Sequence, residues 1–595
     1  MGIELKDYVG DPIFIEKMNK AFADLRADYE LSLDTSKEKI KELKSLHVDH
    51  KNNLANLVSL STVSSGVLSG LRGTGKTHLF LLARDAINND VLKNKAICIY
   101  LNVKRLHLPQ NFDQELFNRV FSLFVYDEFV KQLTGLLHDI NDTIRLQSWL
   151  TLFSGDKRKF IRSIDEAIEK IIIFRSVVYH GSQRFENLDK GNVGKEQNEK
   201  ELIELKNEIV AKLNFNNPEF STKLSTQYLN EISQKISENN TYLDYLNIQD
   251  VRNQFLETLS ILNLKSITFY VDEWEKLYYN QKAQEYLAFF IDRIIDTPFY
   301  FWVGYVPHRG RLYNLENGAD LQHYFNLDES LVYEISSHDK TQCMNYFKKL
   351  VDNRLNYYFK DLPISYATLF NNDHKFEMLV LASMGNSRDF GTMLLDCWTE
   401  YQAYRTNPLS PGRPYKYISD SMIVASIKKN GDKKFSNIRD DKTLLFVWKD
   451  LENFCINRKS SHFAIEELKE NFDVMYNEVY SALIYHRLLH FRKGHVSPKE
   501  PTYPNKLSIY ALNYAGIYDL HAKERKITFI TDYDSIHDKV RRYIYNPVTV
   551  IENIRIREGE LFPCKSCSNN INVTKMKAAW EKNSCPFCGG IIYNV

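Results

Sequence analysis

A glycine-rich segment near the start of the chain has the residue types that hold phosphate groups. Residues 70–77 read Gly-Leu-Arg-Gly-Thr-Gly-Lys-Thr and fit the pattern G-x-x-x-x-G-K-[ST]. In such a loop, backbone N–H groups and the N-terminus of the next helix surround the phosphates. The Lys76 ammonium would reach the β- and γ-phosphates, and the Thr77 hydroxyl would bind Mg²⁺. The predicted nucleotide contacts in and beside this loop are Gly70, Gly73, Thr74, Gly75, Lys76, Thr77 and His78.

A second segment ends in two carboxylates. Residues 266–271 form an apolar strand pattern, and Asp272 and Glu273 follow it directly. Asp272 would hold the Mg²⁺ shell, while Glu273 would orient and deprotonate the attacking water. Many buried strands end on solvated acids, so this segment gains its meaning from the phosphate loop. Together the two segments predict ATP hydrolysis, with Lys76 and Glu273 as catalytic residues and Thr77 and Asp272 as Mg²⁺ ligands.

Four cysteines near the end of the sequence have metal-ligand spacing. Two C-x₂-C pairs, Cys564 with Cys567 and Cys585 with Cys588, are separated by seventeen residues. This spacing is typical of a four-thiolate zinc site. A unit of about 40 residues buries too little surface to fold alone, so zinc would supply the folding free energy. Disulfides and a redox dithiol are the alternatives; Cys98, Cys343, Cys397 and Cys455 are expected to be core residues.

Composition limits the classes of protein that remain. The 595 residues exceed one hydrophobic core, and several domains are expected. A formal net charge of +1 excludes a chain-wide surface for polyanions, so any nucleic-acid surface must be a local patch. The first residues lack a signal-peptide pattern, and no run approaches the roughly 18 apolar residues of a membrane span. A cytoplasmic protein without a membrane partner is predicted.

The phosphate loop and the two carboxylates must be positioned by a sheet. Strands are expected at residues 66–69, 95–103, 266–272, 299–306 and 330–335, with helices between them. This alternation predicts a parallel α/β sheet covered by helices on both faces. The interval 105–265 is too long for a connection and has helical periodicity, which predicts a helical insertion. Within it we expect a polar loop at residues 181–200. An amphipathic helix at residues 202–213 would pack on its own domain or bind a partner.

The second half of the chain predicts a helical block followed by a winged helix. Helices are expected at residues 339–405, within 409–435, from residue 442, from residue 460 and over about 475–489, and paired strands at 491–495 and 507–510. A helix, a turn, a helix and a hairpin form the winged-helix order.

The hairpin and the helix end before it are basic. The residues concerned are His486, Arg487, His490, Arg492, Lys493, His495, Lys499 and Lys506, and the basic character continues at Lys539, Arg541, Arg542, Arg555 and Arg557. A winged helix would place its second helix in the major groove and the basic wing on phosphates, which predicts duplex DNA as a partner. Protein docking and simple solvation of the charges are the alternatives.

These motifs resemble those of the AAA+ ATPases of the origin-recognition and helicase-loader (ORC-like) group, and of their STAND-like prokaryotic relatives. Besides the phosphate loop and the Asp272-Glu273 pair, residues 385–389, Gly-Asn-Ser-Arg-Asp, are similar to the lid motif of that group. The resemblance implies that Arg388 contacts the γ-phosphate; an exposed helix arginine is the alternative. It covers residues 67–104 and 266–515 and leaves the insertion and the cysteine segment outside.

The loop after residues 299–306 departs from the group. The strand lacks the small polar residue that senses the γ-phosphate there, and Tyr305 and His308 are the nearest substitutes. Arg309 and Arg311 follow, where such ATPases often carry a finger that completes the site of a neighbouring subunit. A solvated loop is the alternative for this arginine pair.

The expected fold is α/β: a P-loop NTPase parallel sheet with a helical lid, a helical insertion, a winged-helix-like domain and a small zinc ribbon. The predicted divisions are N-terminal helices (1–66), an ATPase core (67–336) with its insertion (105–265), a lid (337–408), a winged-helix-like domain (409–520), a basic linker (521–557) and a zinc ribbon (558–595). ATP, Mg²⁺ and Zn²⁺ are the expected cofactors. ATP-gated binding of duplex DNA is the leading prediction, with a homo-oligomer or partner subunits; a STAND-like switch or sensor subunit acting on a protein partner is the alternative. The intact Lys76, Thr77, Asp272 and Glu273 disfavour a scaffold with a dead nucleotide site.

Overall fold

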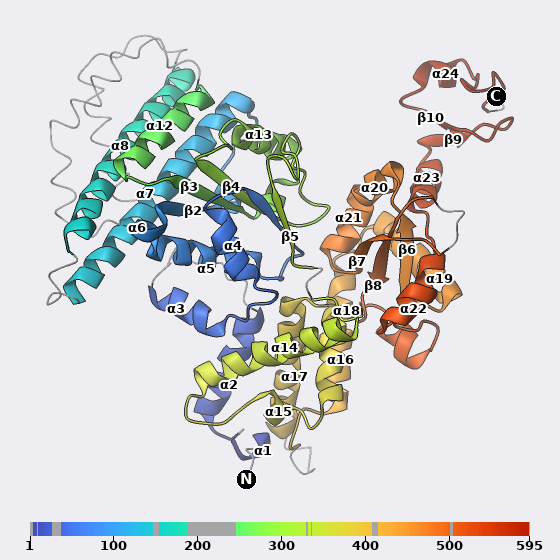
Figure 1. Cartoon of the computed structure of the whole chain (residues 1–595). Helices are drawn as coiled ribbons and strands as arrows, with labels where there is room; N and C mark the ends of the chain where they lie inside the picture. The colour runs from blue at the N-terminus through green and yellow to red at the C-terminus, as the bar shows by residue number, and fades with distance from the viewer. Residues whose placement is uncertain are drawn as a thin grey trace.

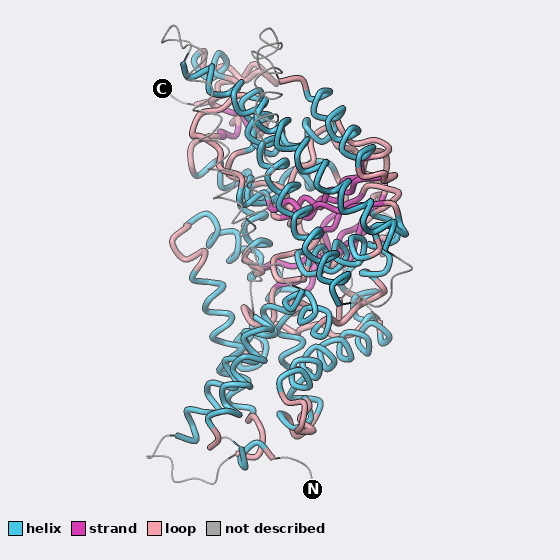
Figure 2. Tube along the Cα trace, turned by 90° about the vertical axis from the view of Figure 1, so that its left-hand side faces the viewer, coloured by secondary structure: helices cyan, strands magenta, loops and turns pink. Residues whose placement is uncertain are grey.

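The computed structural model describes residues 4–8, 10–26, 37–146, 154–187, 246–328, 331–334, 336–406, 415–499 and 504–593. A central α/β core carries a helical arm on one side and a helical lid below it, and a smaller α/β unit leads to the C-terminal ribbon (Figure 1). The N-terminal helices and the ribbon stay at opposite ends of the molecule in the perpendicular view (Figure 2). The helix expected at residues 202–213 lies outside the described residues.

Five parallel strands form the central sheet in the order β2-β3-β4-β1-β5. The strands are β1 (Gly66–Ser69), β2 (Ala96–Asn102), β3 (Ser266–Asp272), β4 (Phe299–Tyr305) and β5 (His323–Asn326). Every residue of β1 and β3 is buried, because helices cover both faces, and the two strands therefore read as continuous apolar runs. The first strand lies between β4 and β5, so the loop after it leaves the sheet where the chain connections diverge, the usual ligand position in such sheets.

The last strand differs from its prediction. The expected strand at residues 330–335 is wrong: residues 331–334 form a turn and bends, and β5 lies earlier in the chain. As a short edge strand, β5 is at most half-buried and lacks an apolar run. The apolar residues Leu331, Val332 and Tyr333 that suggested a strand are buried away from the sheet, and Tyr333 belongs to the core of the lid.

Helices cover the sheet and build the insertion. The elements near the sheet are α4 (Asn53–Ser61), α5 (Lys76–Asn89), α6 (Val91–Asn94), η1 (Val103–Arg105), η3 (Trp274–Leu277) and α13 (Gln281–Asp292). Within the described residues, the insertion contains α7 (Gln114–Leu146), α8 (Ser154–Asn187) and α12 (Ile248–Ile261), which lie side by side (Figure 1). The loop expected from residue 181 is wrong as far as Asn187, because α8 continues through this polar stretch; residues 188–200 lie outside the described part.

The lid is built from two distant parts of the chain. Its helices are α14 (Ser337–Tyr358), α15 (Tyr366–Leu369), α16 (Asp373–Ser383) and α17 (Ser387–Thr406), joined by α1 (Leu5–Tyr8), α2 (Pro12–Arg26) and α3 (Lys37–Leu46). In α2, Phe14 and Phe22 both contact the Trp398 ring of α17. Of the predicted N-terminal helices, α1 and α2 therefore complete the core of the lid, whereas buried residues of α3 and α4 cluster with those of α5.

A three-stranded antiparallel sheet defines the second α/β unit. Its elements are α18 (Asp420–Ser436), α19 (Lys442–Arg458), β6 (His462–Glu466), α20 (Lys469–Met475), α21 (Glu478–Tyr485), β7 (Leu489–Val496) and β8 (Leu507–Leu512). The helix expected from residue 460 is wrong, because this segment forms β6 and pairs with β8. The helix expected over 475–489 is shorter in the structure: α21 begins at Glu478, after Asn477 has accepted a hydrogen bond from the N–H of Val479, and ends at Tyr485, while Leu489 begins β7. From α19 onward, the order of helix, strand, two helices and hairpin is winged-helix-like.

The predicted basic linker is a packed segment. It contains α22 (Tyr533–Asp538), η5 (Val540–Arg542) and α23 (Pro547–Arg557). The chain after η5 pairs with β6 through reciprocal backbone bonds, from Ala464 to Tyr543 and from Tyr545 to Ala464. The ribbon follows with β9 (Leu561–Pro563), β10 (Asn570–Asn572) and α24 (Lys577–Glu581). Among the helices described, none combines the length and apolarity needed to cross a bilayer.

Candidate nucleotide and metal sites

A cavity of about 600 Å³ lies between the phosphate loop, the lid and the N-terminal segment. Most of the predicted site residues line it: Gly73, Thr74, Gly75, Lys76, Thr77, His78, Glu273 and Arg388. Gly70 and Asp272 lie behind this wall, where they bind the side chains of Lys76 and Thr77. One cavity therefore collects residues from the sheet and the lid.

The loop backbone requires two of its glycines. Gly73 and Gly75 have φ angles of 92° and 96°, in the region that favours glycine. A Cβ atom on Gly73 would lie only 2.5 Å from the Cβ atom of Arg388, so the lid leaves no room for a side chain there. Gly75 caps α5, whose N-terminal N–H groups and dipole favour a bound anion.

Lys76 is buried, and among the described residues its ammonium donates hydrogen bonds to neutral groups. The side chain is 7% exposed, and Nζ donates to the carbonyl oxygens of Gly70 at 2.7 Å and Leu71 at 3.3 Å. Carbonyl dipoles satisfy the donors but do not neutralise the charge. The ammonium is thus held at the cavity wall in a form that can exchange a carbonyl for a phosphate oxygen.

Asp272 and Thr77 form a ready pair of oxygen ligands. The Thr77 hydroxyl donates to Asp272 Oδ2 at 2.6 Å, and the Tyr100 hydroxyl donates to the same oxygen at 2.8 Å. Burial and the nearby Glu273 charge raise the pKa of Asp272, although these hydrogen bonds oppose the shift. A carboxylate and a hydroxyl in contact beside a phosphate loop fit Mg²⁺, which takes oxygen ligands and keeps most of its waters.

Glu273 stands directly after β3 in an unusual backbone conformation. Its φ of 64° lies in the left-handed region, which is uncommon for a residue with a side chain. The Lys276 ammonium lies 3.8 Å from Oε2, but this buried oxygen accepts no hydrogen bond from any described residue. The carboxylate faces the cavity, where a water molecule can be oriented.

The lid motif reaches the phosphate loop, as the sequence predicts. The Asn386 side chain donates to the carbonyl oxygen of Arg72 at 2.8 Å, and its Oδ1 accepts from the N–H of Asp389 at 3.1 Å. This pair of bonds fixes the start of α17 against the loop and places Arg388 in the cavity wall.

Part of the cavity comes from a segment without a sequence signal. Residues 46–50 line it, and the Nδ1 atom of His47 lies 3.1 Å from His78 Nε2. The lid holds this segment, because Arg354 donates to the carbonyl oxygen of Leu46 at 3.2 Å. Burial lowers the pKa of His78 to about 3, so its imidazole is neutral. The contact of Arg354 with Leu46 joins residues 308 positions apart, which no local pattern records.

The predicted substitutes for the γ-phosphate sensor are not in this cavity. Tyr305 and His308 line a second cavity of about 310 Å³, between the core, the lid and the winged-helix-like unit. The expected trans finger Arg309 is buried, with its guanidinium 4.5 Å from the Tyr278 ring centroid and 4.7 Å from that of Tyr485. A residue stacked in this way cannot reach a neighbouring subunit, whereas Arg311 is exposed.

Two cations of the predicted DNA patch are bound to buried carboxylates. Arg492 donates from Nη2 to Glu334 Oε2 at 2.8 Å, and its Nε contacts the other oxygen of that carboxylate. Arg487 and Lys434 lie 3.0 Å and 2.8 Å from Asp389 Oδ2. These ion pairs fasten the winged-helix-like unit to the lid, so Arg487 and Arg492 are not available for DNA in this conformation.

The helix expected to enter the major groove is covered. Residues 480–484 of α21 are all buried, and the helix carries no basic residue. At its end, the Tyr485 hydroxyl lies 3.4 Å from Nη1 of Arg72, in the phosphate loop. The prediction of an exposed second helix is therefore wrong here. The exposed cations of this region are Lys499, Lys506, Lys539 and Arg542.

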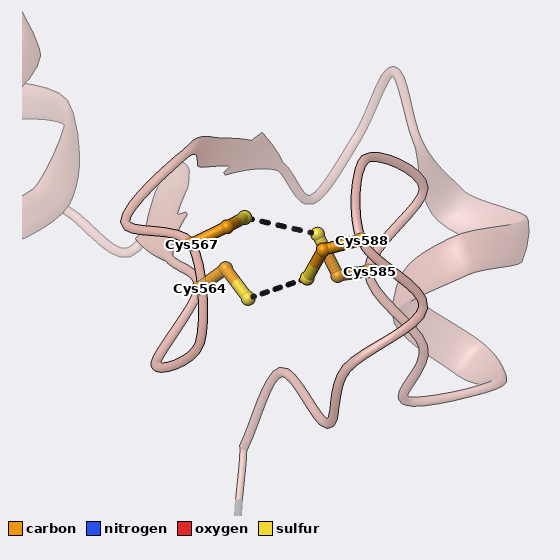
Figure 3. A group of neighbouring side chains, drawn as sticks. All are labelled: Cys564, Cys567, Cys585 and Cys588. Atoms are coloured by element: carbon orange, nitrogen blue, oxygen red, sulfur yellow. Dashed lines mark hydrogen bonds between the residues drawn. The ribbon is translucent and has the colours of Figure 1, made fainter.

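The four predicted metal ligands converge in the ribbon (Figure 3). All four sulfur atoms lie within 4.8 Å of one another, with 3.7 Å from Cys564 to Cys588 and from Cys567 to Cys585. Zn–S bonds of about 2.3 Å in a tetrahedron place sulfur atoms about 3.8 Å apart, so the cluster fits zinc. Backbone N–H groups lower the pKa of Cys564 to about 6, which favours its thiolate.

Comparisons with known proteins find similar solved structures, among them two from Aeropyrum pernix. The Aeropyrum pernix ORC1 protein in complex with DNA is 10% identical, with a TM-score of 0.29 over 81% of this chain and 96% of that chain. The Aeropyrum pernix ORC2 protein, in ADPNP-ADP complexes, is 9% identical, with a TM-score of 0.32 over 88% and 95%. No family model and no curated protein matches the chain.

Proposed function

We propose that this chain is an ATP-binding and ATP-hydrolysing AAA+ protein of the ORC-like type. The observation that carries the proposal is the set of side chains around the 600 Å³ cavity: Lys76 on neutral carbonyls, Thr77 in contact with Asp272, and Glu273 at the wall. This set supplies a cation for phosphates, oxygen ligands for Mg²⁺ and a carboxylate for water. Arg388 would add a second cation from the lid.

Each residue has a role that follows from its position. Bound Mg²⁺ would neutralise phosphate charge and would be held by Thr77 and Asp272. Lys76 would leave the loop carbonyls and bind the β- and γ-phosphates, which replaces dipoles by an opposite charge. Glu273 would hold the attacking water and take its proton. Arg388, fixed through Asn386, would bind the γ-phosphate only while the lid is closed.

Direct measurement of ATP binding and turnover tests this function. Lys76→Ala should weaken ATP binding by about 100-fold, because it removes a charge-assisted contact to two phosphates. Lys93→Ala, on the exposed face of α6, is the matched control and should bind like the wild type. Equal ATP affinity in Lys76→Ala, or a wild type without turnover, would contradict the proposal.

Duplex DNA is the second candidate ligand, and the hairpin between β7 and β8 is the surface that favours it. The Lys499 ammonium lies 2.9 Å from Asp538, and Arg541 donates to the carbonyl oxygen of Ser497 at 2.9 Å, so the hairpin and the α22–η5 segment form one face. Their exposed cations suit phosphate contacts without base reading. Charge removal at Lys506, Lys539 and Arg542 together should lower affinity and the salt dependence of binding, measured by fluorescence anisotropy with ATP. No binding at low salt would favour the STAND-like switch acting on a protein partner.

The cysteine cluster is proposed as a structural zinc site. Four thiolates close the metal shell and leave no open position for a substrate, so the metal would stabilise the ribbon rather than react. Metal analysis should give about one zinc per chain for the wild type. Cys585→Ser should lose the zinc while ATP turnover remains, and retention of stoichiometric zinc would contradict the four-thiolate assignment.

A further inference from the structure

The nucleotide cavity contains a third acidic residue, Glu275, that no motif singles out. It lies in η3, two residues after Glu273, and lines the cavity. The residue is only 5% exposed, and its Oε2 accepts no hydrogen bond from any described residue. A buried carboxylate oxygen without a donor is costly, so such groups are rare unless a ligand completes them.

The carboxylate of Asp272 is more fully hydrogen-bonded than those of Glu273 and Glu275. Both oxygens of Asp272 are occupied: Oδ2 accepts from Thr77 and Tyr100, and Oδ1 accepts from the N–H of Glu273. Glu273 has the Lys276 ammonium 3.8 Å away. Hence both oxygens of Asp272 already accept hydrogen bonds, whereas Oε2 of Glu275, like Oε2 of Glu273, keeps its capacity to accept one.

We propose that Glu275 is a second catalytic carboxylate, which orients the attacking water together with Glu273. The inference rests on the proposed ATPase function and concerns the same cavity. In the hydrolytic step, the water oxygen bonds to the γ-phosphorus while the bond from that phosphorus to the β–γ bridging oxygen breaks. The electron pair leaves with ADP, and the water proton passes to the carboxylate pair.

The electrostatic surroundings of Glu275 suit a proton acceptor. Burial raises its pKa to about 7, while the Lys76 ammonium opposes the shift and the Glu273 and Asp272 carboxylates support it. Lys104 and Arg105, from the adjoining η1, line the same cavity and add positive charge. A base whose pKa lies near the working pH can accept a proton during the reaction and release it afterwards.

Turnover and ATP affinity, measured separately, test the role. Glu275→Gln should lower kcat by about 100-fold, within the range of general base catalysis, and change the Kd for ATP by less than about threefold, because glutamine keeps the shape of the side chain. Glu285→Gln, an exposed acid on α13, is the matched control and should keep full turnover. The double variant with Glu273→Gln should lose less than the product of the two single effects, since both groups act on one water.

Each further outcome has a defined meaning. An unchanged kcat in Glu275→Gln, or a change confined to the Kd for ATP, overturns the catalytic role. If Glu275→Gln does not fold, Glu275→Asp carries the test: the retracted carboxylate should lower kcat at unchanged Kd for ATP, and full turnover overturns the proposal. A wild type that binds no ATP overturns the proposed function and this inference together, whereas an active wild type with a fully active Glu275→Gln overturns this inference alone.

Discussion

The phosphate loop and the interface between the lid and the winged-helix-like unit both bury cations, but they bind them differently. Lys76 rests on two neutral carbonyls. Arg492 and Arg487 rest on the carboxylates of Glu334 and Asp389. A carbonyl satisfies a donor and leaves the charge, whereas a buried carboxylate cancels the charge and is itself stranded if the cation moves. The first region is built to exchange its partner, and the second is built to keep it.

Removing one carboxylate of the interface should have the largest effect on stability. Glu334→Gln leaves the Arg492 guanidinium buried without an opposite charge, and a loss of about 3–5 kcal/mol in the free energy of unfolding is expected. Lys76→Ala strands no charge and should change stability by less than about 1 kcal/mol. Urea unfolding of both variants measures the two losses of stability, with Glu470→Gln, at an exposed residue, as the control. Equal losses in Glu334→Gln and Lys76→Ala would contradict the difference proposed between the two regions.

Acid should weaken the interface between the lid and the winged-helix-like unit. Burial alone would raise the pKa of Glu334 and Asp389, but the neighbouring Arg492 and Arg487 hold both values well below the usual range. Their stabilisation is complete above the unfolded-state pKa of about 4 and is lost as the pH falls further. The urea midpoint should therefore fall as the pH is lowered from about 4.5 towards 3. Glu334→Gln should show a smaller fall, and an identical fall would contradict the assignment.

The contact of α21 with the phosphate loop should give the smallest effect. Tyr485 lies between the guanidinium groups of Arg309, 4.7 Å from its ring centroid, and Arg72 at 5.9 Å. Tyr485→Leu keeps apolar bulk but removes these cation–π contacts, which should cost about 1–2 kcal/mol. Hydrogen exchange of residues 480–485 should report the loosening. The control is Tyr533→Leu, which changes an exposed tyrosine beside Lys493. Unchanged exchange in Tyr485→Leu would show that its cation–π contacts do not stabilise α21.

The sequence predicts those parts of the site whose geometry is local. Residues 70–77 determine a loop, and two C-x₂-C pairs determine a metal cluster, because the ligands lie on short turns. The Asp-Glu pair after a buried strand is of the same kind, and Glu275 could have been noticed from its spacing two residues beyond Glu273. The parallel pairing of the central strands follows from the alternation of strands and helices.

The residues that pair across the fold are far apart in the chain, and the sequence-based predictions for these residues were wrong. Arg492 pairs with a glutamate 158 residues away in the chain. From the sequence alone, this arginine is therefore taken for a surface cation. The apolar run at residues 462–465 suits a strand or a helix until β8 pairs with it. Residues 331–333 suggested a strand because they are apolar, but they are buried away from the sheet.

The contacts of Tyr485 with Arg72 and Arg309 connect the covered face of α21 to the phosphate loop, so a ligand of that face would be coupled to nucleotide affinity. A molecule that needs the covered face of this helix can bind only the open fraction of the protein, so its apparent dissociation constant is the intrinsic value divided by that fraction. A nucleotide that changes the open fraction also changes the affinity for this ligand. Coupling free energies are reciprocal, so the ligand changes the affinity for the nucleotide by the same factor. Through Tyr485, which contacts both Arg72 and Arg309, ligand binding to the covered face of α21 and nucleotide binding at the phosphate loop would then change each other's affinity.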